Sequence, residues 1–341
     1  MAIIDPNSEN ILEIKDLTVR YETDFEIVEA INDLSLELKK NETLGLVGET
    51  GAGKTTTALS IMGLVPNPPG KIIRGKILFN GEDLLKKSEK EMRKIRGEKI
   101  SMVFQDPMTS LNPVLTIGSQ IAEVIQLHSK ISKTEAVKRA VDMLETVGIP
   151  GGRYDEYPHQ FSGGMKQRVV IAIAIACNPL MIIADEPTTA LDVTIQFQVL
   201  ELMNDLKKKF NTSMILITHD LGVVAEVCDK VAIMYSGEII ESGSLQQIFE
   251  NRQHPYTKGL FNSIPDLDED IDRLLAIEGL MPDPSDLPSG CKFHPRCRER
   301  MPECDKTDFP LIEFEPGHKV RCLKCMTHKS GLSPIISKAE E

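Results

Sequence analysis

Short, continuous apolar runs predict a buried parallel sheet. Thr43–Val47, Leu180–Ala184 and Ser213–Thr218 are almost wholly apolar, each is followed by a glycine or a polar residue, and Ile100–Phe104 is a further candidate strand. Such runs are typical of strands that are covered by helices on both faces. We therefore predict an α/β fold whose core is a parallel sheet.

Alternating apolar and polar positions predict a second, antiparallel β region. Residues 11–47 contain such stretches, for example Leu34–Leu38, and Lys71–Asn80 is a further candidate strand. Alternation with a period of two indicates strands that have one face on a core and the other in solvent. We expect these strands to form an antiparallel β-subdomain beside the parallel core.

Helical patterns lie between the strands. Residues 116–149 hold two of them, and the second opens with a capping box from Ser132 to Glu135. Residues 169–177 alternate as a strand would, but the preceding Ser-Gly-Gly, the alanines and the stop at Asn178-Pro179 favour a buried helix. The sequence therefore predicts a helical insertion within the α/β domain.

Composition limits the location and the partners of the chain. It has 341 residues, 41% of them hydrophobic, and a formal net charge of -12. The acidic balance disfavours broad binding to nucleic acid, which needs clustered Lys and Arg. No segment has the length of apolar sequence that a membrane span requires, and Met1–Pro6 does not resemble the start of a secretory leader. We expect a cytosolic protein.

A complete phosphate-loop motif spans Gly48 to Thr55, between a predicted strand and a predicted helix. Gly51 and Gly53 let the backbone turn its N–H groups towards an anion, and the start of the helix adds its positive dipole end. Lys54 would contact the β- and γ-phosphates, and the Thr55 hydroxyl would hold Mg2+. The motif predicts a nucleoside triphosphate site.

Several polar residues follow the predicted strands at the edge where ligands collect. Asp185 and Glu186 end one strand; an aspartate here would hold Mg2+, and the neighbouring acid would polarise a water for attack on the γ-phosphate. His219 follows another strand, where it could bond the γ-phosphate, and Gln105 follows a third. Tyr21 could stack on a purine base, although alone it could equally be a surface tyrosine.

The order of these motifs over residues 10–245 resembles that of the ATP-binding cassette (ABC) family. The matching features are the phosphate loop, Gln105, Ser162-Gly163-Gly164, Asp185-Glu186, Thr189–Asp192 and His219. The resemblance implies a cassette over residues 1–250 with a RecA-like parallel core, an antiparallel β-subdomain and a helical subdomain at about 108–165. It also implies Mg-ATP held by the phosphate loop with Thr56 and Tyr21, Mg2+ ligated by Thr55, Gln105 and Asp185, and catalysis by Glu186, His219 and Gln105.

The same resemblance implies a head-to-tail dimer of cassettes. ATP on one subunit would be closed by Ser162, Gly163 and Gly164 of its partner, with Asp192 near the dimer interface. The usual signature reads Leu-Ser-Gly-Gly-Gln, whereas this chain has Phe161 and Met165. The backbone donors of the signature are kept, but Met165 lacks the amide group of the usual glutamine.

Residues 251–341 resemble the C-terminal extension of dipeptide, oligopeptide and nickel importer ATPases, on His254–Leu260 and Ser289–Cys297. The resemblance implies the ATP-hydrolysing motor of a peptide importer at the cytoplasmic side of the cell membrane. Its partners would be two permease subunits, a second cassette (a paralogue or a second copy) and, indirectly, an extracytoplasmic peptide-binding protein. A nickel importer, or a soluble ATPase that acts on nucleic acid or another protein machine, remains an alternative.

Five of the seven cysteines lie between residues 291 and 325. In a reducing compartment such a group favours a metal over disulfides. Cys291, Cys297, Cys304 and Cys322 are separated by five, six and seventeen residues, whereas structural zinc sites usually show closely spaced pairs. We therefore expect a [4Fe-4S] cluster that holds the extension folded, with zinc as the alternative. Cys325 could replace one ligand.

Overall fold

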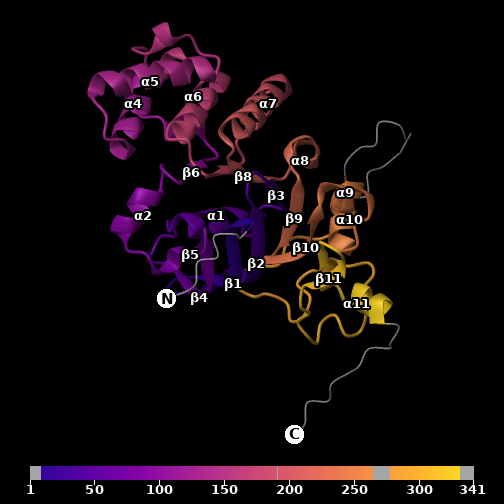
Figure 1. Cartoon of the computed structure of the whole chain (residues 1–341). Helices are drawn as coiled ribbons and strands as arrows, with labels where there is room; N and C mark the ends of the chain where they lie inside the picture. Colours follow the sequence, from indigo (N-terminus) through magenta and orange to yellow (C-terminus); the bar gives the residue numbers. More distant parts are fainter. Residues whose placement is uncertain (1–8, 190, 264–276, 331–341) are drawn as a thin grey trace.

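The computed structural model describes residues 9–189, 191–263 and 277–330, and in these residues two sheets carry the fold (Figure 1). The first sheet is antiparallel, in the order β2-β1-β4-β5. Its β2 strand buries Leu34, Leu36 and Leu38 and exposes the residues between them, as the alternation predicts. The strands are β1 (Asn10–Glu22), β2 (Ile27–Lys39), β4 (Gly70–Phe79) and β5 (Glu82–Asp83).

The second sheet has eight strands in the order β11-β12-β10-β9-β3-β8-β7-β6. Its five strands from β9 to β6 are parallel, and β3, β7 and β8 are buried along their whole length, as the apolar runs predict. The strands are β3 (Thr43–Val47), β6 (Ile100–Val103), β7 (Met181–Asp185), β8 (Ser213–Thr218), β9 (Lys230–Tyr235), β10 (Glu238–Ser244), β11 (Ile312–Glu315) and β12 (His318–Val320).

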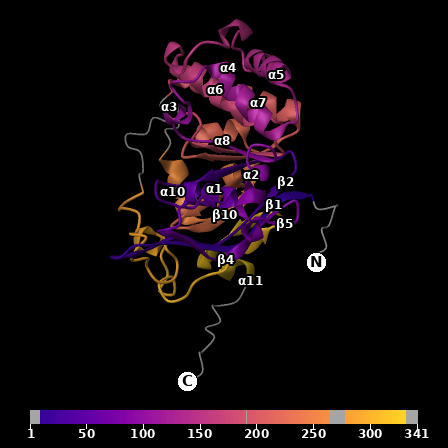
Figure 2. The same ribbon diagram turned by 90° about the vertical axis from the view of Figure 1, so that its left-hand side faces the viewer.

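Helices α4, α5 and α6 form a lobe beyond the β6 edge of this sheet (Figures 1 and 2). The helices are α1 (Lys54–Met62), α2 (Glu89–Ile95), α3 (Pro107–Ser110), α4 (Ile117–His128), α5 (Lys133–Thr146), α6 (Gly163–Ile175), α7 (Val193–Phe210), α8 (Leu221–Val227), α9 (Leu245–Glu250), α10 (Pro255–Asn262) and α11 (Leu323–Ser330). Four short 3-10 turns lie at Leu84–Lys86, Gly151–Arg153, Pro158–Gln160 and His294–Arg296.

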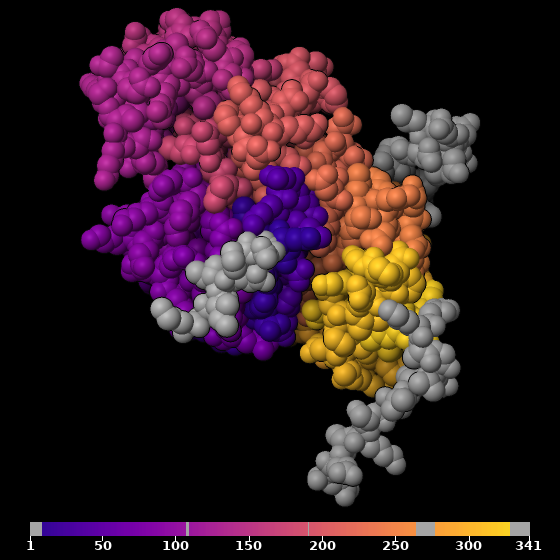
Figure 3. Space-filling model, viewed as in Figure 1, coloured from indigo at the N-terminus to yellow at the C-terminus, as the bar shows by residue number. Residues whose placement is uncertain are grey.

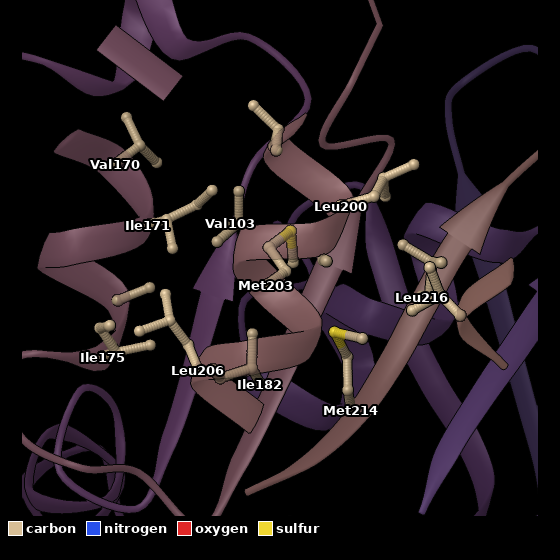
Figure 4. Packing of buried hydrophobic residues seen from close by; sticks show 14 of the residues in the cluster. Val103, Val170, Ile171, Ile175, Ile182, Leu200, Met203, Leu206, Met214 and Leu216 are labelled. Carbon is tan, nitrogen blue, oxygen red and sulfur yellow. The ribbon is translucent and has the colours of Figure 1, made fainter. Parts of the chain in front are cut away.

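Helix α6 is the segment whose alternation resembled a strand, and the structure confirms that it is helical. Its N-cap is Ser162, whose hydroxyl accepts a hydrogen bond from the Met165 N–H at 3.4 Å. Its side chains, including Ile171, pack with Met203 of α7 over the parallel strands (Figure 4). A helix that is apolar on nearly every side is stable here because neighbours cover it.

The predicted capping box of α5 is confirmed only in part. The Ser132 hydroxyl accepts from the Glu135 N–H at 3.2 Å, but the Glu135 carboxylate pairs with Arg139 one turn later. Both side chains of that pair are about half exposed, so the pair adds little to stability. The start of the helix therefore depends on Ser132.

The C-terminal extension packs against the rest of the molecule (Figure 3), and its strands β11 and β12 extend the central sheet. Strand β12 pairs antiparallel with β10, and β11 pairs with β12. Between them, the fully buried His318 bonds to Glu241 at 2.8 Å and to Glu315 at 3.1 Å. Burial disfavours the imidazolium, but these two carboxylates outweigh it and raise the pKa of His318. Strand pairing and buried polar contacts therefore hold the described part of the extension. The fold of these residues does not show the expected metal site.

Candidate functional site

The phosphate loop runs from Gly48 to Thr55 and joins β3 to α1. Gly51 and Gly53 have φ values of 84° and 103°, in the left-handed region. A Cβ on Gly53 would lie 2.5 Å from the carbonyl oxygen of Ala30. Only glycine satisfies both the conformation and this close approach. The loop is therefore shaped to turn N–H groups inward, and α1 begins at the same point.

The Lys54 side chain is hydrogen-bonded to the backbone of its own phosphate loop. Its ammonium donates to the carbonyl oxygens of Gly48 at 2.7 Å and Glu49 at 3.0 Å. Burial lowers the pKa of Lys54, while the carboxylates of Glu186, Asp185 and Glu49 act against that shift. An ammonium group that two loop carbonyls hold in place, near the carboxylates of Asp185 and Glu186, is suited to bind a triphosphate.

Asp185 ends β7 beside Thr55 and is almost fully buried. Burial raises the pKa of Asp185, and a hydrogen bond from the Thr55 hydroxyl opposes that rise. Its Oδ1 atom has no hydrogen-bond partner in the part of the chain that the structure describes. A buried carboxylate oxygen without a partner is costly, and a hard divalent cation takes such oxygens as ligands. Thr55 and Asp185 therefore fit Mg2+.

Glu186 has the unusual positive φ of 46° for a non-glycine residue, a strain that is common at functional sites. Three side chains hold its carboxylate. Gln105 Nε2 and the Thr189 hydroxyl both donate to Oε2 at 2.9 Å, and His219 Nδ1 lies 3.3 Å from Oε1. The carboxylate is thereby fixed in orientation while it still faces the cleft.

One cleft collects most of the residues that the sequence predicts for nucleotide binding. It is lined by Tyr21, the loop from Thr50 to Thr56, Gln105, Glu186 and His219. The Tyr21 hydroxyl lies 3.5 Å from that of Thr56. Pro284, from the C-terminal extension, also lines the cleft, and its carbonyl accepts from the Glu29 N–H at 2.8 Å.

The Ser162-Gly163-Gly164 segment does not line this cleft. Ser162 and Gly163 are exposed at the start of α6, and Asp192 caps α7 by accepting from the Ile195 N–H at 3.0 Å. The structure therefore presents the signature on the surface and does not bring it to the phosphate loop of the same chain.

The four cysteines predicted as ligands surround one small cavity, which Cys325 does not line. The Cys304 sulfur accepts a hydrogen bond from the Met301 N–H at 3.4 Å. Burial raises the pKa of Cys291 and of Cys297, and the backbone N–H groups of Phe293 and Glu299 act against that rise. The neighbouring Cys325 lowers the pKa of Cys322. Across residues 9–189, 191–263 and 277–330, however, no group of three or more His, Cys, Asp or Glu side chains is arranged to hold a metal ion.

Comparison with known proteins shows the family. A family model described as "ABC transporter" matches residues 31–189, and one described as "Oligopeptide/dipeptide transporter, C-terminal region" matches residues 240–304. The oligopeptide transport ATP-binding protein AppD of Bacillus subtilis is 51% identical over 92% of this chain and 96% of its own length. OppD of Escherichia coli is 49% identical over 95% and 96%.

The chain belongs to the ABC ATPases of the oligopeptide and dipeptide transport type. Solved cassettes agree with this assignment. The ATP-binding cassette MJ0796, in a dimeric post-hydrolysis state bound to ADP and Pi, has a TM-score of 0.62 and is 29% identical, over 69% of this chain and 98% of its own. The structure of cbiO1 from Clostridium perfringens, part of the ABC transporter complex cbiONQ, also has a TM-score of 0.62, at 28% identity over 72% of this chain and 92% of its own. The family and the cassette fold predicted from the motifs are confirmed.

Sequence reasoning missed several residues at the site of this ABC ATPase. The sequence marks Thr189 only as part of a motif, whereas in the structure its hydroxyl donates to Glu186. Pro284, Tyr256 and Arg296 come from the extension, and Arg296 donates to the Glu49 carboxylate at 3.1 Å. No local sequence pattern predicts such contacts, because the contacting residues lie far apart in the sequence.

Among the described residues, no helix is long and apolar enough to cross a membrane.

Proposed function

We propose that this ABC ATPase is the motor of an importer for di- and oligopeptides, peripheral to the cytoplasmic side of the membrane. The observation that carries the proposal is the agreement of the relatives' names, as transport ATP-binding proteins for oligopeptides and dipeptides, over more than nine tenths of the chain. Two permease subunits carry the substrate path, and an extracytoplasmic peptide-binding protein delivers the peptide. Neither nickel nor nucleic acid appears in these names.

The residues of the cleft support ATP hydrolysis. Lys54 and the loop N–H groups hold the triphosphate, and Thr56 and Tyr21, whose hydroxyls lie 3.5 Å apart, also contact the nucleotide. Thr55, Asp185 and the amide oxygen of Gln105 hold Mg2+, which neutralises phosphate charge when bound. Glu186 takes the proton of the attacking water, and His219 orients Glu186 and bonds the γ-phosphate.

A second cassette completes the site. Ser162, Gly163 and Gly164 of one cassette donate to the γ-phosphate bound by the other, and Asp192 lies at the same interface. Ser162, Gly163 and Asp192 are exposed at the starts of α6 and α7, away from the cleft of their own chain, which supports this arrangement. The partner is a paralogue or a second copy of this chain.

Stimulation of hydrolysis tests the function. ATP turnover is measured for the chain with its second cassette alone, then with the permease pair, with DNA and with ribosomes. Turnover that rises only with the permease pair supports a transport motor. Stimulation by DNA or ribosomes without permease would contradict it and favour a soluble machine.

The proposal includes a structural [4Fe-4S] cluster bound by Cys291, Cys297, Cys304 and Cys322. The support is that all four cysteines line one cavity and that the Met301 N–H donates to the Cys304 sulfur, because backbone N–H bonds favour thiolates and tune such clusters. No group of three or more His, Cys, Asp or Glu side chains in the described residues is arranged for a metal ion, so the proposal depends on the shared cavity and on the spacing of the cysteines in the sequence.

Anaerobic purification tests the cluster. Brown protein with about four irons per chain is expected, and Cys291→Ser should lose the colour. Cys325→Ser is the matched control and should keep it, because Cys325 lies outside the cavity lining. Colourless protein with one zinc per chain would contradict the cluster.

A further inference from the structure

In the part of the chain that the structure describes, the extension hydrogen-bonds to the phosphate loop at Glu49. The Arg296 guanidinium donates to both oxygens of the Glu49 carboxylate, at 3.1 and 3.2 Å. The Tyr256 hydroxyl accepts from the Glu49 N–H at 3.1 Å. The Arg296 side chain is only 6% exposed, and Tyr256 is fully buried. Backbone and side chain of Glu49 are thus both held from outside the cassette motifs.

Glu49 in turn shapes the part of the loop that faces the triphosphate. Its carbonyl oxygen accepts from the Lys54 ammonium at 3.0 Å and from the Ala52 N–H at 3.2 Å. Its carboxylate is close enough to act on the pKa of Lys54. A carboxylate here without a cationic partner would repel the phosphates, because charges at this range interact strongly in a partly buried site. Arg296 supplies that partner.

The contacts to Glu49 depend on the folded cysteine-rich loop. Arg296 is followed directly by Cys297, and Phe293 lies in the same loop. The Phe293 ring packs edge-on against Tyr235 at 5.3 Å and Tyr256 at 5.4 Å, and those two rings are 4.6 Å apart. Loosening the loop would therefore withdraw both the guanidinium and the aromatic support of Tyr256.

We propose that Arg296 and Tyr256 are positioning residues for ATP. They keep the phosphate loop in its binding shape and neutralise Glu49, so that the folded state of the extension sets the ATP affinity of the same chain. The inference rests on the proposed nucleotide site at Lys54. It assigns the extension a role in nucleotide binding in addition to holding itself against the cassette.

Titration of the full chain with a fluorescent ATP analogue tests the inference. Arg296→Ala should raise the Kd about tenfold, which corresponds to about 1.4 kcal/mol. In steady state it should raise KM for ATP and leave kcat nearly unchanged. Arg298→Ala is the matched control: Arg298 lies in the same loop, but its ion pair with Glu278 is exposed. It should bind ATP as the wild type does.

Two further variants separate charge from folding. Arg296→Lys keeps the cation and should stay within about threefold of the wild-type Kd. Adding Glu49→Gln to Arg296→Ala removes the unpaired carboxylate and should restore binding to a similar range. Arg296→Ala that binds like the Arg298→Ala control, or a double variant without recovery, would overturn the inference. Wild-type affinity in Lys54→Ala would instead contradict the proposed nucleotide site itself.

Discussion

Replacing Glu186 by glutamine removes one charge and keeps the shape of the side chain. The amide oxygen can take the position of Oε2 and still accept from Gln105 Nε2 and the Thr189 hydroxyl, both at 2.9 Å. The new NH2 group then faces His219 Nδ1, at the present distance of 3.3 Å, where a neutral imidazole can accept. We therefore expect the variant to fold as the wild type does.

The loss should fall on the chemical step. General-base catalysis by a positioned group contributes roughly 10²- to 10⁴-fold, so the barrier should rise by about 2.7 to 5.5 kcal/mol. ATP should bind at least as tightly, because Glu186 is one of the carboxylates whose charge acts on Lys54. Single-turnover phosphate release measures the first effect, and titration with a fluorescent ATP analogue measures the second.

Two companion variants make the result specific. Lys54→Ala should lose ATP affinity, since it removes a contact to the phosphates. Thr189→Val removes only one of the three contacts to the Glu186 carboxylate and should slow phosphate release by about tenfold, or about 1.4 kcal/mol. Phosphate release by Glu186→Gln within about tenfold of the wild type would refute its role as the base.

Three further predictions address the loop, the extension and the dimer. Gly53→Ala should destabilise the fold by about 1 to 3 kcal/mol in urea unfolding, because of its positive φ and the nearby carbonyl, whereas Gly152→Ala, with open space around it, should stay within about 0.5 kcal/mol. The raised pKa of His318 gives a stabilisation that is complete below its unfolded pKa of about 6.5 and is lost as pH rises through the folded pKa; the difference in Tm between wild type and His318→Gln should therefore shrink from pH 6 to pH 9, and a constant difference would contradict this. Ser162→Arg should still bind ATP but abolish the ATP-dependent dimer of Glu186→Gln in light scattering with its partner cassette, and an unchanged dimer would exclude Ser162 from the interface.

The parts of the site that were predictable are those whose residues are neighbours in sequence. The phosphate loop, and Asp185 with Glu186 after a buried strand, carry their chemistry within a few positions, so pattern and spacing identify them. The α6 helix was also predictable, because its cap and its stop signal outweighed a misleading period.

The parts that were not predictable depend on pairing across long stretches of chain. Arg296 meets Glu49 across 247 positions, and β12 joins β10 through two residue pairs in a segment of low hydrophobicity. Neither leaves a local pattern, since a short strand or a single arginine is compatible with many environments. The capping box of α5 shows that a complete local motif can also mislead. Ser132 and Glu135 are both present, but the Glu135 carboxylate pairs with Arg139 instead of the start of the helix.

The most direct test of the account is peptide uptake by proteoliposomes that hold this chain, its second cassette and the permease pair. Uptake of a labelled oligopeptide delivered by the binding protein should require ATP, and it should be abolished by Lys54→Ala and by Glu186→Gln. Nickel offered in place of peptide should neither be transported nor compete. ATP-driven nickel uptake without peptide uptake, or peptide uptake that persists in both variants, would contradict the proposed function.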